Sequence, residues 1–193
     1  MFSALLDTCV LWPSLQRDFL LSLAVEGLYR PLWSEAILEE LEYHECQKLV
    51  ERHSVVEGIA AIRAARLVDR MRTAFSDALV VGWEGLEGSY GLPDADDEHV
   101  VAAAVVGGAG AIVTYNVKDF PAGRVPRSIQ VLRPAEFLVS TVAMEPVRSM
   151  RAVSKIASRS GRQGPARTTD EVLDELSRRY DLHAAVSLIR EYG

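Results

Sequence analysis

Short apolar runs alternate with longer segments of helical periodicity along most of this chain of 193 residues. The apolar runs have the length of buried strands and comprise residues 2–6, 32–33, 78–82, 111–115 and 129–132. Helical segments are expected over residues 14–26, from Ser34 onward, over 56–75 and over 94–106. This alternation favours an α/β fold in which helices cover both faces of a short parallel sheet with right-handed crossovers.

Several residues belong to the types that begin or end helices. Ser14, Ser34 and Thr169 are predicted N-caps, because their side-chain oxygens can accept free N–H groups of a first turn. Gly27 and the pair Gly107–Gly108 are predicted to end the helices that precede them. These residues place the helix boundaries used below.

The character of the chain changes near Glu145 and Pro146. Residues 1–144 carry a net charge of −8, whereas residues 145–193 carry +2. The second segment should form helices over 146–158, 169–180 and around 185–189, with a flexible loop over 160–165. Because this tail has too little apolar surface to fold alone, we predict a domain over 1–144 and a helical extension over 145–193 that packs on it or on a partner.

Composition excludes several classes of protein. Hydrophobic residues make up 49% of the chain and charged residues 25%, which suffices for an ordinary core. The net charge of −6 argues against a basic coat for nucleic acid, but a metal site built from acids leaves a nucleic-acid substrate open. Cys9 and Cys46 are too few for a zinc site and are expected to be reduced thiols. With neither a membrane-spanning run nor a basic N-terminal region, the chain is expected in the cytoplasm.

Acidic residues that can meet at one cleft lie at four points of the sequence: two follow predicted strands, one group lies at a helix start, and one pair lies in the first turns of a helix. Ligands of open parallel sheets bind outside the carboxyl ends of the strands, so these acids should lie at one cleft. Oxygen donors without a histidine or cysteine partner suit Mg²⁺ or Mn²⁺. The acids are Asp7, Glu39 or Glu40, the cluster Asp94, Asp96 and Asp97, and Asp119.

Each acid also has a structural interpretation. Asp94 or Asp96 can cap the helix that follows, and one of Glu39 and Glu40 can be a solvated surface residue. Three acids in four positions nevertheless repel one another more than a cap requires, and a divalent cation would offset that repulsion. His99 is the one histidine beside these acids, and its role can be structural or a contact with substrate or ligand.

Four motifs follow one another along the chain: LLDTCVL at 5–11, WSEAILEEL at 33–41, LPDADDEHVVAAA at 92–104 and IVTYNVKDFP at 112–121. In this order they resemble the motifs of PIN-domain nucleases, in particular those of VapC-type toxins of bacterial toxin–antitoxin pairs. The resemblance covers residues 1 to about 140, and the tail is similar to a C-terminal extension found in one branch of these toxins.

The resemblance assigns roles to individual residues. It implies that Thr114 and Asn116 hold their loop and orient the carboxylates, with Asp94 and Asp96 in support. Cys9 departs from the Asn or Ser of many members, so the hydrogen bond that such a residue supplies is in question. Glu40 is preferred to Glu39 because Leu41 follows it, as in the family. The implied ligands of Mg²⁺ or Mn²⁺ are Asp7, Glu40, Asp97 and Asp119.

The implied activity is hydrolysis of RNA phosphodiester bonds by a metal-dependent endoribonuclease, with one or two metal ions, as the toxin of a type II toxin–antitoxin pair. The implied partners are RNA, a cognate antitoxin protein and, as one option, a second copy of the chain. An alternative is a non-catalytic PIN fold that binds RNA or protein. A hydrolase with an aspartyl nucleophile would need a second aspartate two residues after Asp7, where Cys9 stands.

Basic residues form one predicted helix face in the tail. Three- and four-residue steps place them on the same side of the helix. The face can contact the RNA backbone, or it can pack against the acidic part of the chain, and both interpretations stay open. Its members are Arg148, Arg151, Lys155 and Arg159.

Overall fold

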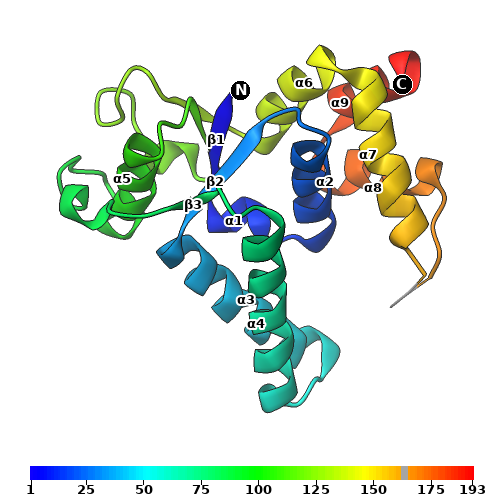
Figure 1. The fold of residues 1–193 in the computed structure, drawn as a ribbon, viewed down its shortest axis with the longest axis horizontal. Helices are drawn as coiled ribbons and strands as arrows, with labels where there is room; N and C mark the ends of the chain where they lie inside the picture. The colour runs from blue at the N-terminus through cyan, green and yellow to red at the C-terminus, as the bar shows by residue number, and fades with distance from the viewer. Residues whose placement is uncertain (162–164) are drawn as a thin grey trace. The chain divides into compact units, whose positions relative to one another are not determined.

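The computed structural model describes residues 1–161 and 165–193, which form two compact units (Figure 1). We call the first the sheet unit; it comprises Ser3–Trp12 and Pro31–Val131. We call the second the helical unit; it comprises Met1–Phe2, Pro13–Arg30 and Leu132–Gly193. The predicted flexible loop over 160–165 includes residues 162–164, which lie outside the described residues.

A five-stranded sheet has the strand order β3-β2-β1-β4-β5. β1 pairs with β4 in parallel, with Leu5 opposite Ile112, and β2 pairs with β3 in parallel. The chain therefore adds β2 and β3 on one side of β1 and then returns to add β4 and β5 on the other side. The strands are β1 Ser3–Leu6, β2 Arg30–Ser34, β3 Leu79–Val80, β4 Ala111–Val113 and β5 Gln130–Leu132.

The helices of the sheet unit follow the strands that they connect. α3 packs along α4, and α5 packs against β1 and β4 with its apolar segment from Val100 to Ala104 buried. Ser34 caps α3 as predicted, because its Oγ accepts the N–H of Ile37 at 3.3 Å. The elements are α1 Thr8–Leu11, α3 Glu35–His53, α4 Glu57–Ala74 and α5 Glu98–Val106, with 3₁₀ turns η1 Glu84–Leu86, η2 Ala95–Asp97 and η3 Val117–Asp119.

In the helical unit, α7 lies against α2, α8 and α9, and α6 packs on α9 (Figure 1). The apolar face of α7 contains Ala152, Val153 and Ile156, all of which are buried. The helices are α2 Ser14–Val25, α6 Pro134–Met144, α7 Pro146–Arg159, α8 Thr169–Tyr180 and α9 His183–Tyr192. The helical unit thus contains α2 and α6 in addition to the helices of the tail. The domain boundary predicted between residues 144 and 145 remains a prediction.

Two predicted caps are wrong by one residue. Ser14 is the first residue of α2, and Pro13 occupies the cap position without a side-chain hydrogen bond. Thr168, not Thr169, caps α8, because its Oγ1 accepts the N–H of Glu171, whose carboxylate accepts the N–H of Thr168 in return. Two adjacent threonines leave a one-residue ambiguity at α8, and helix ends are in general uncertain by one or two residues.

The predicted α/β class, with a short parallel sheet and C-terminal helices, is confirmed. Cys9 and Cys46 are free thiols, as expected. Within the described parts of the chain, no helix combines the length and apolar character needed to cross a bilayer.

Candidate active site

Asp7 lies where the order of the strands reverses. It directly follows β1, and its N–H donates to the carbonyl of Val113 at 3.1 Å, which ties it to the end of β4. β4 is the strand that the chain reaches only after it has completed the other side of the sheet. Such a reversal opens a crevice at the carboxyl ends of the two strands, and this is where α/β sheets bind ligands.

Two side chains hold the carboxylate of Asp7, which is only 6% exposed. The hydroxyl of Thr114, at the end of β4, donates to Asp7 Oδ2 at 2.6 Å. The thiol of Cys9 donates to the same oxygen at 3.1 Å, and Cys9 Sγ accepts the N–H of Tyr115 at 3.2 Å. Asp7 is thus a buried anion whose orientation is fixed by donors from both strands' ends.

Cys9 donates a hydrogen bond to Asp7 despite its departure from the family pattern. Burial and the charge of Asp7 raise the pKa of Cys9 to about 12. The sulfur therefore keeps its proton near neutral pH and remains a donor to Asp7. The cysteine thus makes a hydrogen bond to the carboxylate of Asp7 although it departs from the usual residue.

Glu40, on α3, faces the same site. Thr8 Oγ1 donates to Glu40 Oε2 at 2.7 Å, and His99 Nε2 lies 3.2 Å from Glu40 Oε1. Burial raises the pKa of Glu40, but the hydrogen bonds from His99 and Thr8 outweigh it and keep that pKa below its usual value. These contacts favour Glu40 over Glu39 as the site residue of α3.

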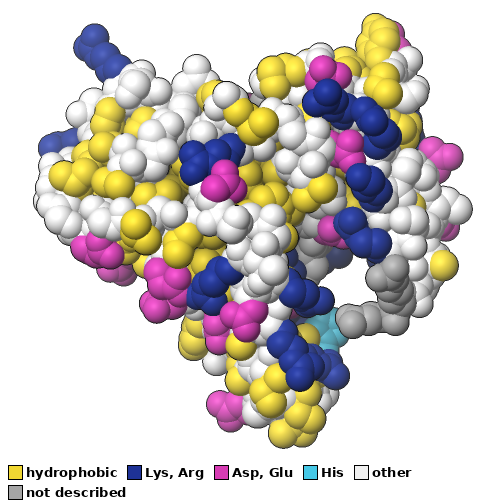
Figure 2. All heavy atoms as spheres, in the orientation of Figure 1, with side chains coloured by type: hydrophobic (Ala, Val, Ile, Leu, Met, Phe, Trp, Pro, Cys, Tyr) yellow, Lys and Arg dark blue, Asp and Glu magenta, His cyan; other side chains and the backbone are white. Residues whose placement is uncertain are grey.

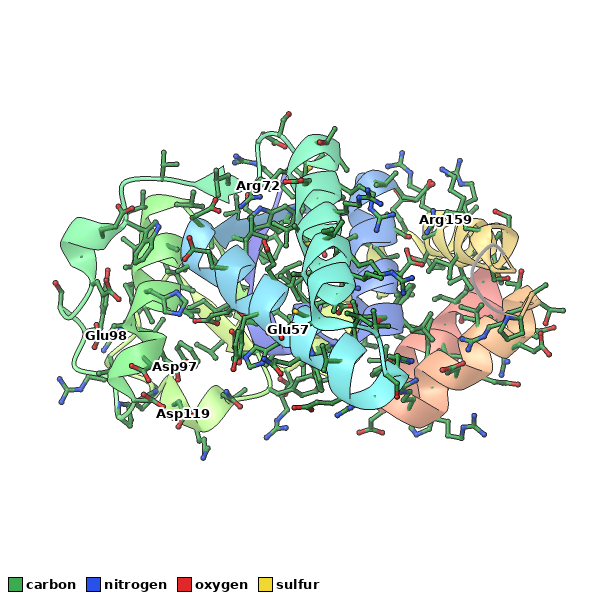
Figure 3. The ribbon with its side chains drawn as sticks, turned by 90° about the horizontal axis from the view of Figure 1, so that it is seen from below. Glu57, Arg72, Asp97, Glu98, Asp119 and Arg159 are labelled. Atoms are coloured by element: carbon green, nitrogen blue, oxygen red, sulfur yellow. The ribbon has the colours of Figure 1, made fainter. Side chains whose placement is uncertain are left out.

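Asp97, at the end of η2, is surrounded by negative charge. Burial raises its pKa first, and the charges of Asp7, Asp94 and Asp119 raise it further, to about 6. Figure 3 labels Asp97 and Asp119, which come from η2 and η3 and lie near each other at one side of the sheet unit. The structure thus brings together carboxylates that are far apart in the sequence.

The predicted supporting residues differ in what they do. Asp94 caps η2, since its Oδ1 accepts the N–H of Asp96 at 3.0 Å, whereas Asp96 itself is exposed. Thr114 Oγ1 accepts the N–H of Asn116 at 3.0 Å, so Asn116 acts through its backbone. Asp119 closes η3 by donating its N–H to the carbonyl of Asn116 at 2.8 Å. The structural interpretation thus applies to Asp94.

The sequence did not predict the two residues that contact the carboxylate of Glu40, nor a further acid that is buried. Thr8 was given no role, and the role of His99 was left open, because both contacts cross more than thirty positions of sequence. Glu98 is 3% exposed and accepts the N–H groups of Tyr90 and Leu92 at 3.0 and 2.7 Å. Its signal was an acid at a helix start, separated from the apolar run that begins at Val100 by His99 alone.

The chemistry of these side chains fits a divalent cation. Among the described residues, no three His, Cys, Asp or Glu side chains already converge as a metal-binding group. Like charges repel one another, and after burial the charges of Asp7 and Asp119 contribute to the raised pKa of Asp97. Oxygen donors of this kind suit Mg²⁺ or Mn²⁺, which would offset the repulsion. The residues that would hold the ion are Asp7, Glu40, Asp97 and Asp119.

The basic face of α7 pairs with acids of α2 in the same unit. Lys155 Nζ lies 2.6 Å from Glu26 Oε1, and Arg151 Nε lies 3.8 Å from Glu26 Oε2. Arg159 Nη2 lies 2.7 Å from Asp18 Oδ1. Figure 2 shows the basic side chains in a row with acidic ones between them. This geometry favours packing against acids, and an RNA contact through the predicted face stays a prediction.

Reversing Arg151 and Lys155 to Glu should lower the melting temperature by a few degrees. Exposed pairs contribute up to about 1 kcal/mol each, and the new glutamates would also repel Glu26. Thermal unfolding followed by circular dichroism would measure the shift. The salt dependence of RNA binding should stay unaltered. A flatter slope with an unchanged melting temperature would instead indicate phosphate contacts.

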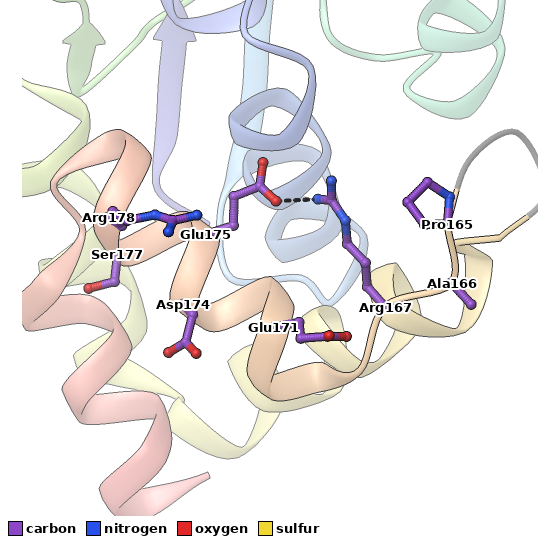
Figure 4. Close-up of a pocket in the computed structure, with 8 residues that line it drawn as sticks. All are labelled: Pro165, Ala166, Arg167, Glu171, Asp174, Glu175, Ser177 and Arg178. Carbon is purple, nitrogen blue, oxygen red and sulfur yellow. Dashed lines mark ion pairs between the residues drawn. The ribbon is translucent and has the colours of Figure 1, made fainter.

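A hollow of about 640 Å³ lies in the helical unit beside α8 (Figure 4). Two of its opposite charges pair with each other, since Arg167 Nη1 lies 2.5 Å from Glu175 Oε2. The lining is mixed, with three acids and two arginines, and none of the predicted site residues belongs to it. The lining residues are Pro165, Ala166, Arg167, Glu171, Asp174, Glu175, Ser177 and Arg178.

Comparison with known proteins gives one finding. A family model described as PIN domain matches residues 3–118, which is more than half of the chain. The comparisons with curated proteins and with solved structures gave no match. The matched residues include Asp7, Glu40 and Asp97, whereas Asp119 follows the last matched position.

Proposed function

Because the chain belongs to the PIN-domain family, we propose that it is a metal-dependent endoribonuclease that hydrolyses RNA phosphodiester bonds. PIN domains are generally nucleases and typically use divalent metals. The observation that carries the proposal is the group of carboxylates around Asp97, whose pKa is raised first by burial and then by the charges of Asp7, Asp94 and Asp119. Without a cation, such a carboxylate cluster would repel the phosphates of RNA. A bound divalent cation would remove that repulsion and so explain the presence of the cluster at a site for RNA.

The roles of the chain's own residues follow from their contacts. Asp7, Glu40, Asp97 and Asp119 would hold Mg²⁺ or Mn²⁺, which supplies a more acidic water and stabilises charge on the transferred phosphoryl group. Thr114 and Cys9 keep the carboxylate of Asp7 in place by donating to it. Fixed donors of this kind remove the need to reorganise the site during the reaction.

We further propose that the chain is the toxin of a type II toxin–antitoxin pair, located in the cytoplasm. The support is the resemblance of its four motifs, in order, to VapC-type toxins. An RNA-cleaving toxin requires a protein partner that blocks it, so an antitoxin is the expected partner. A homodimer is compatible with this proposal.

A non-catalytic PIN fold that only binds RNA or protein is the second candidate. The site argues against it, since all four acids implied by the family motifs are present in the sequence and three of them interact by charge. The donors to Asp7 and Glu40 are also in place. A purely binding fold would have no need for this buried anion and its donors.

Incubation of total RNA with the purified chain tests the proposal. Cleavage is expected with Mg²⁺ or Mn²⁺ and should vanish in EDTA, because the acids alone cannot neutralise phosphate charge. Asp7→Asn should reduce the cleavage rate by at least about 10²-fold, and its product pattern serves as the control for contaminating nucleases. Full cleavage in EDTA would refute the metal mechanism. An absence of cleavage under all metal conditions would favour the binding module.

A further inference from the structure

We propose that Thr8 and His99 are positioning residues that clamp the carboxylate of Glu40 from two sides and so prepare it to bind the cation. This inference rests on the proposed function. Thr8 donates to Oε2 and His99 contacts Oε1, so each oxygen of Glu40 has its own partner. The two partners come from α1 and α5, whereas Glu40 lies on α3.

Glu40 needs such a clamp because its own position is exposed. Its side chain is 45% exposed, and a free glutamate on a helix surface samples many rotamers. The other proposed ligand near the strand ends, Asp7, is short, buried and held by two donors. Without comparable donors, Glu40 would have to be ordered each time a cation binds, which weakens binding.

Thr8 couples Glu40 to Asp7 through the backbone. Thr8 follows Asp7 directly and is only 5% exposed, and its hydroxyl also lies 3.3 Å from the carbonyl of Ile37 on α3. The short hydrogen bond of 2.7 Å to Glu40 therefore comes from a rigid position. One short segment thus presents a carboxylate at Asp7 and fixes a second one at Glu40.

His99 contacts the other oxygen of Glu40, and burial of its ring in this position is energetically unfavourable. It is 6% exposed, and within the described chain its Nδ1 is buried without a hydrogen-bond partner. A buried polar atom left unpaired is unfavourable, so the ring's position calls for a reason. The reason that the structure offers is Nε2, which points at Glu40 while the ring packs beside Trp83. Any form of the ring with a proton on Nε2 can donate this bond.

Four variants test the clamp by removing or retaining each donor. Thr8→Val removes the hydroxyl at nearly constant shape, whereas Thr8→Ser keeps it. His99→Leu removes the donor, whereas His99→Gln places an amide N–H near the position of Nε2. Thr141→Val is the matched control, because Thr141 is a buried threonine whose hydroxyl donates to the carbonyl of Phe137 in the helical unit.

The measurement is the dissociation constant for Mn²⁺ alone by titration calorimetry, with the melting temperature and RNA cleavage recorded for each variant. Loss of a group that orients a metal ligand typically weakens metal binding by about 10- to 100-fold. We expect that loss for Thr8→Val and His99→Leu, and substantial recovery for Thr8→Ser and His99→Gln. Thr141→Val should change the melting temperature only.

The outcomes separate this inference from the nuclease proposal. Unchanged Mn²⁺ affinity in folded Thr8→Val and His99→Leu would overturn the clamp, even if the wild-type chain cleaves RNA. Equal weakening by the donor-retaining variants would overturn it too, because a packing defect would then be the cause. A wild-type chain whose Mn²⁺ affinity depends on the clamp, but which cleaves no RNA, would refute the nuclease proposal alone.

Discussion

Asp97→Asn should abolish RNA cleavage and at the same time make the metal-free protein more stable. Loss of a proposed metal ligand removes stabilisation of the transition state, so the cleavage rate should fall by at least about 10²- to 10³-fold. Burial and, after it, the charges of Asp7, Asp94 and Asp119 raise the pKa of Asp97 to about 6, so loss of the charge relieves both costs. A residue with only a structural role would not give these two changes in opposite directions.

The gain in stability should depend on pH in a defined way. The pKa of Asp97 is raised from 3.8 in the unfolded chain to about 6 in the folded protein. Well below pH 3.8 the group is protonated in both states and the penalty is absent. The penalty grows as the pH rises through 3.8 and is complete above about pH 6. Because Asp97 is partly exposed, we expect a gain of only about 1 kcal/mol above pH 6, or roughly 2–4 °C in melting temperature.

Melting curves in EDTA between pH 4 and pH 8 would measure this gain. Asp69→Asn is the matched control, because Asp69 is an exposed acid of the same unit whose pair with Arg72 is a surface contact. The control should leave cleavage and stability near wild type at every pH. A marked loss of stability in Asp97→Asn would indicate that the carboxylate is needed for folding.

The fold and the acids of the site were predictable because their signals are local. The apolar run that ends at Asp7 and the cap at Ser34 depend on residues within a few positions. Helix α6 was missed although its signals were local too: Pro134 is its first residue, and the carboxylate of Glu136 accepts the N–H of Arg133 at 2.9 Å. The helix was not predicted because a strand precedes it and because α6 contains β-branched residues, which are more typical of strands.

The partners of the acids were not predictable, because they are set by tertiary packing. The hydrogen bonds of Thr114 to Asp7 and of Thr8 to Glu40 join residues 107 and 32 positions apart. Both donors are threonines, and the sequence alone does not distinguish a threonine that binds a site carboxylate from an ordinary buried threonine. The resemblance to the family supplied Thr114 but not Thr8 or His99, so their role became visible only when α1, α3 and α5 were placed together.

Removal of the buried carboxylate of Glu98 should have the largest effect on stability. Glu98 is 3% exposed, and its two oxygens accept the N–H groups of Tyr90 and Leu92. Burial alone would raise its pKa, but hydrogen bonds from the backbone of Leu92, Tyr90, Gly91 and Gly88 outweigh it and lower the pKa. The anion therefore organises the loop that leads to η2 and Asp97.

Glu98→Ala should accordingly lower stability by about 2–4 kcal/mol, or roughly 5–15 °C in melting temperature, because it leaves backbone donors unpaired. The lowered pKa implies that this contribution is complete above pH 4.5 and is lost as the pH falls through the folded-state value. The difference between variant and wild type should therefore shrink in acid. Glu87→Ala, at an exposed acid of the same loop, should unfold like the wild type. If Glu98→Ala also melts at the wild-type temperature, or if the amides of Tyr90 and Leu92 keep their protection from hydrogen exchange, the loop is held by its packing and not by this carboxylate.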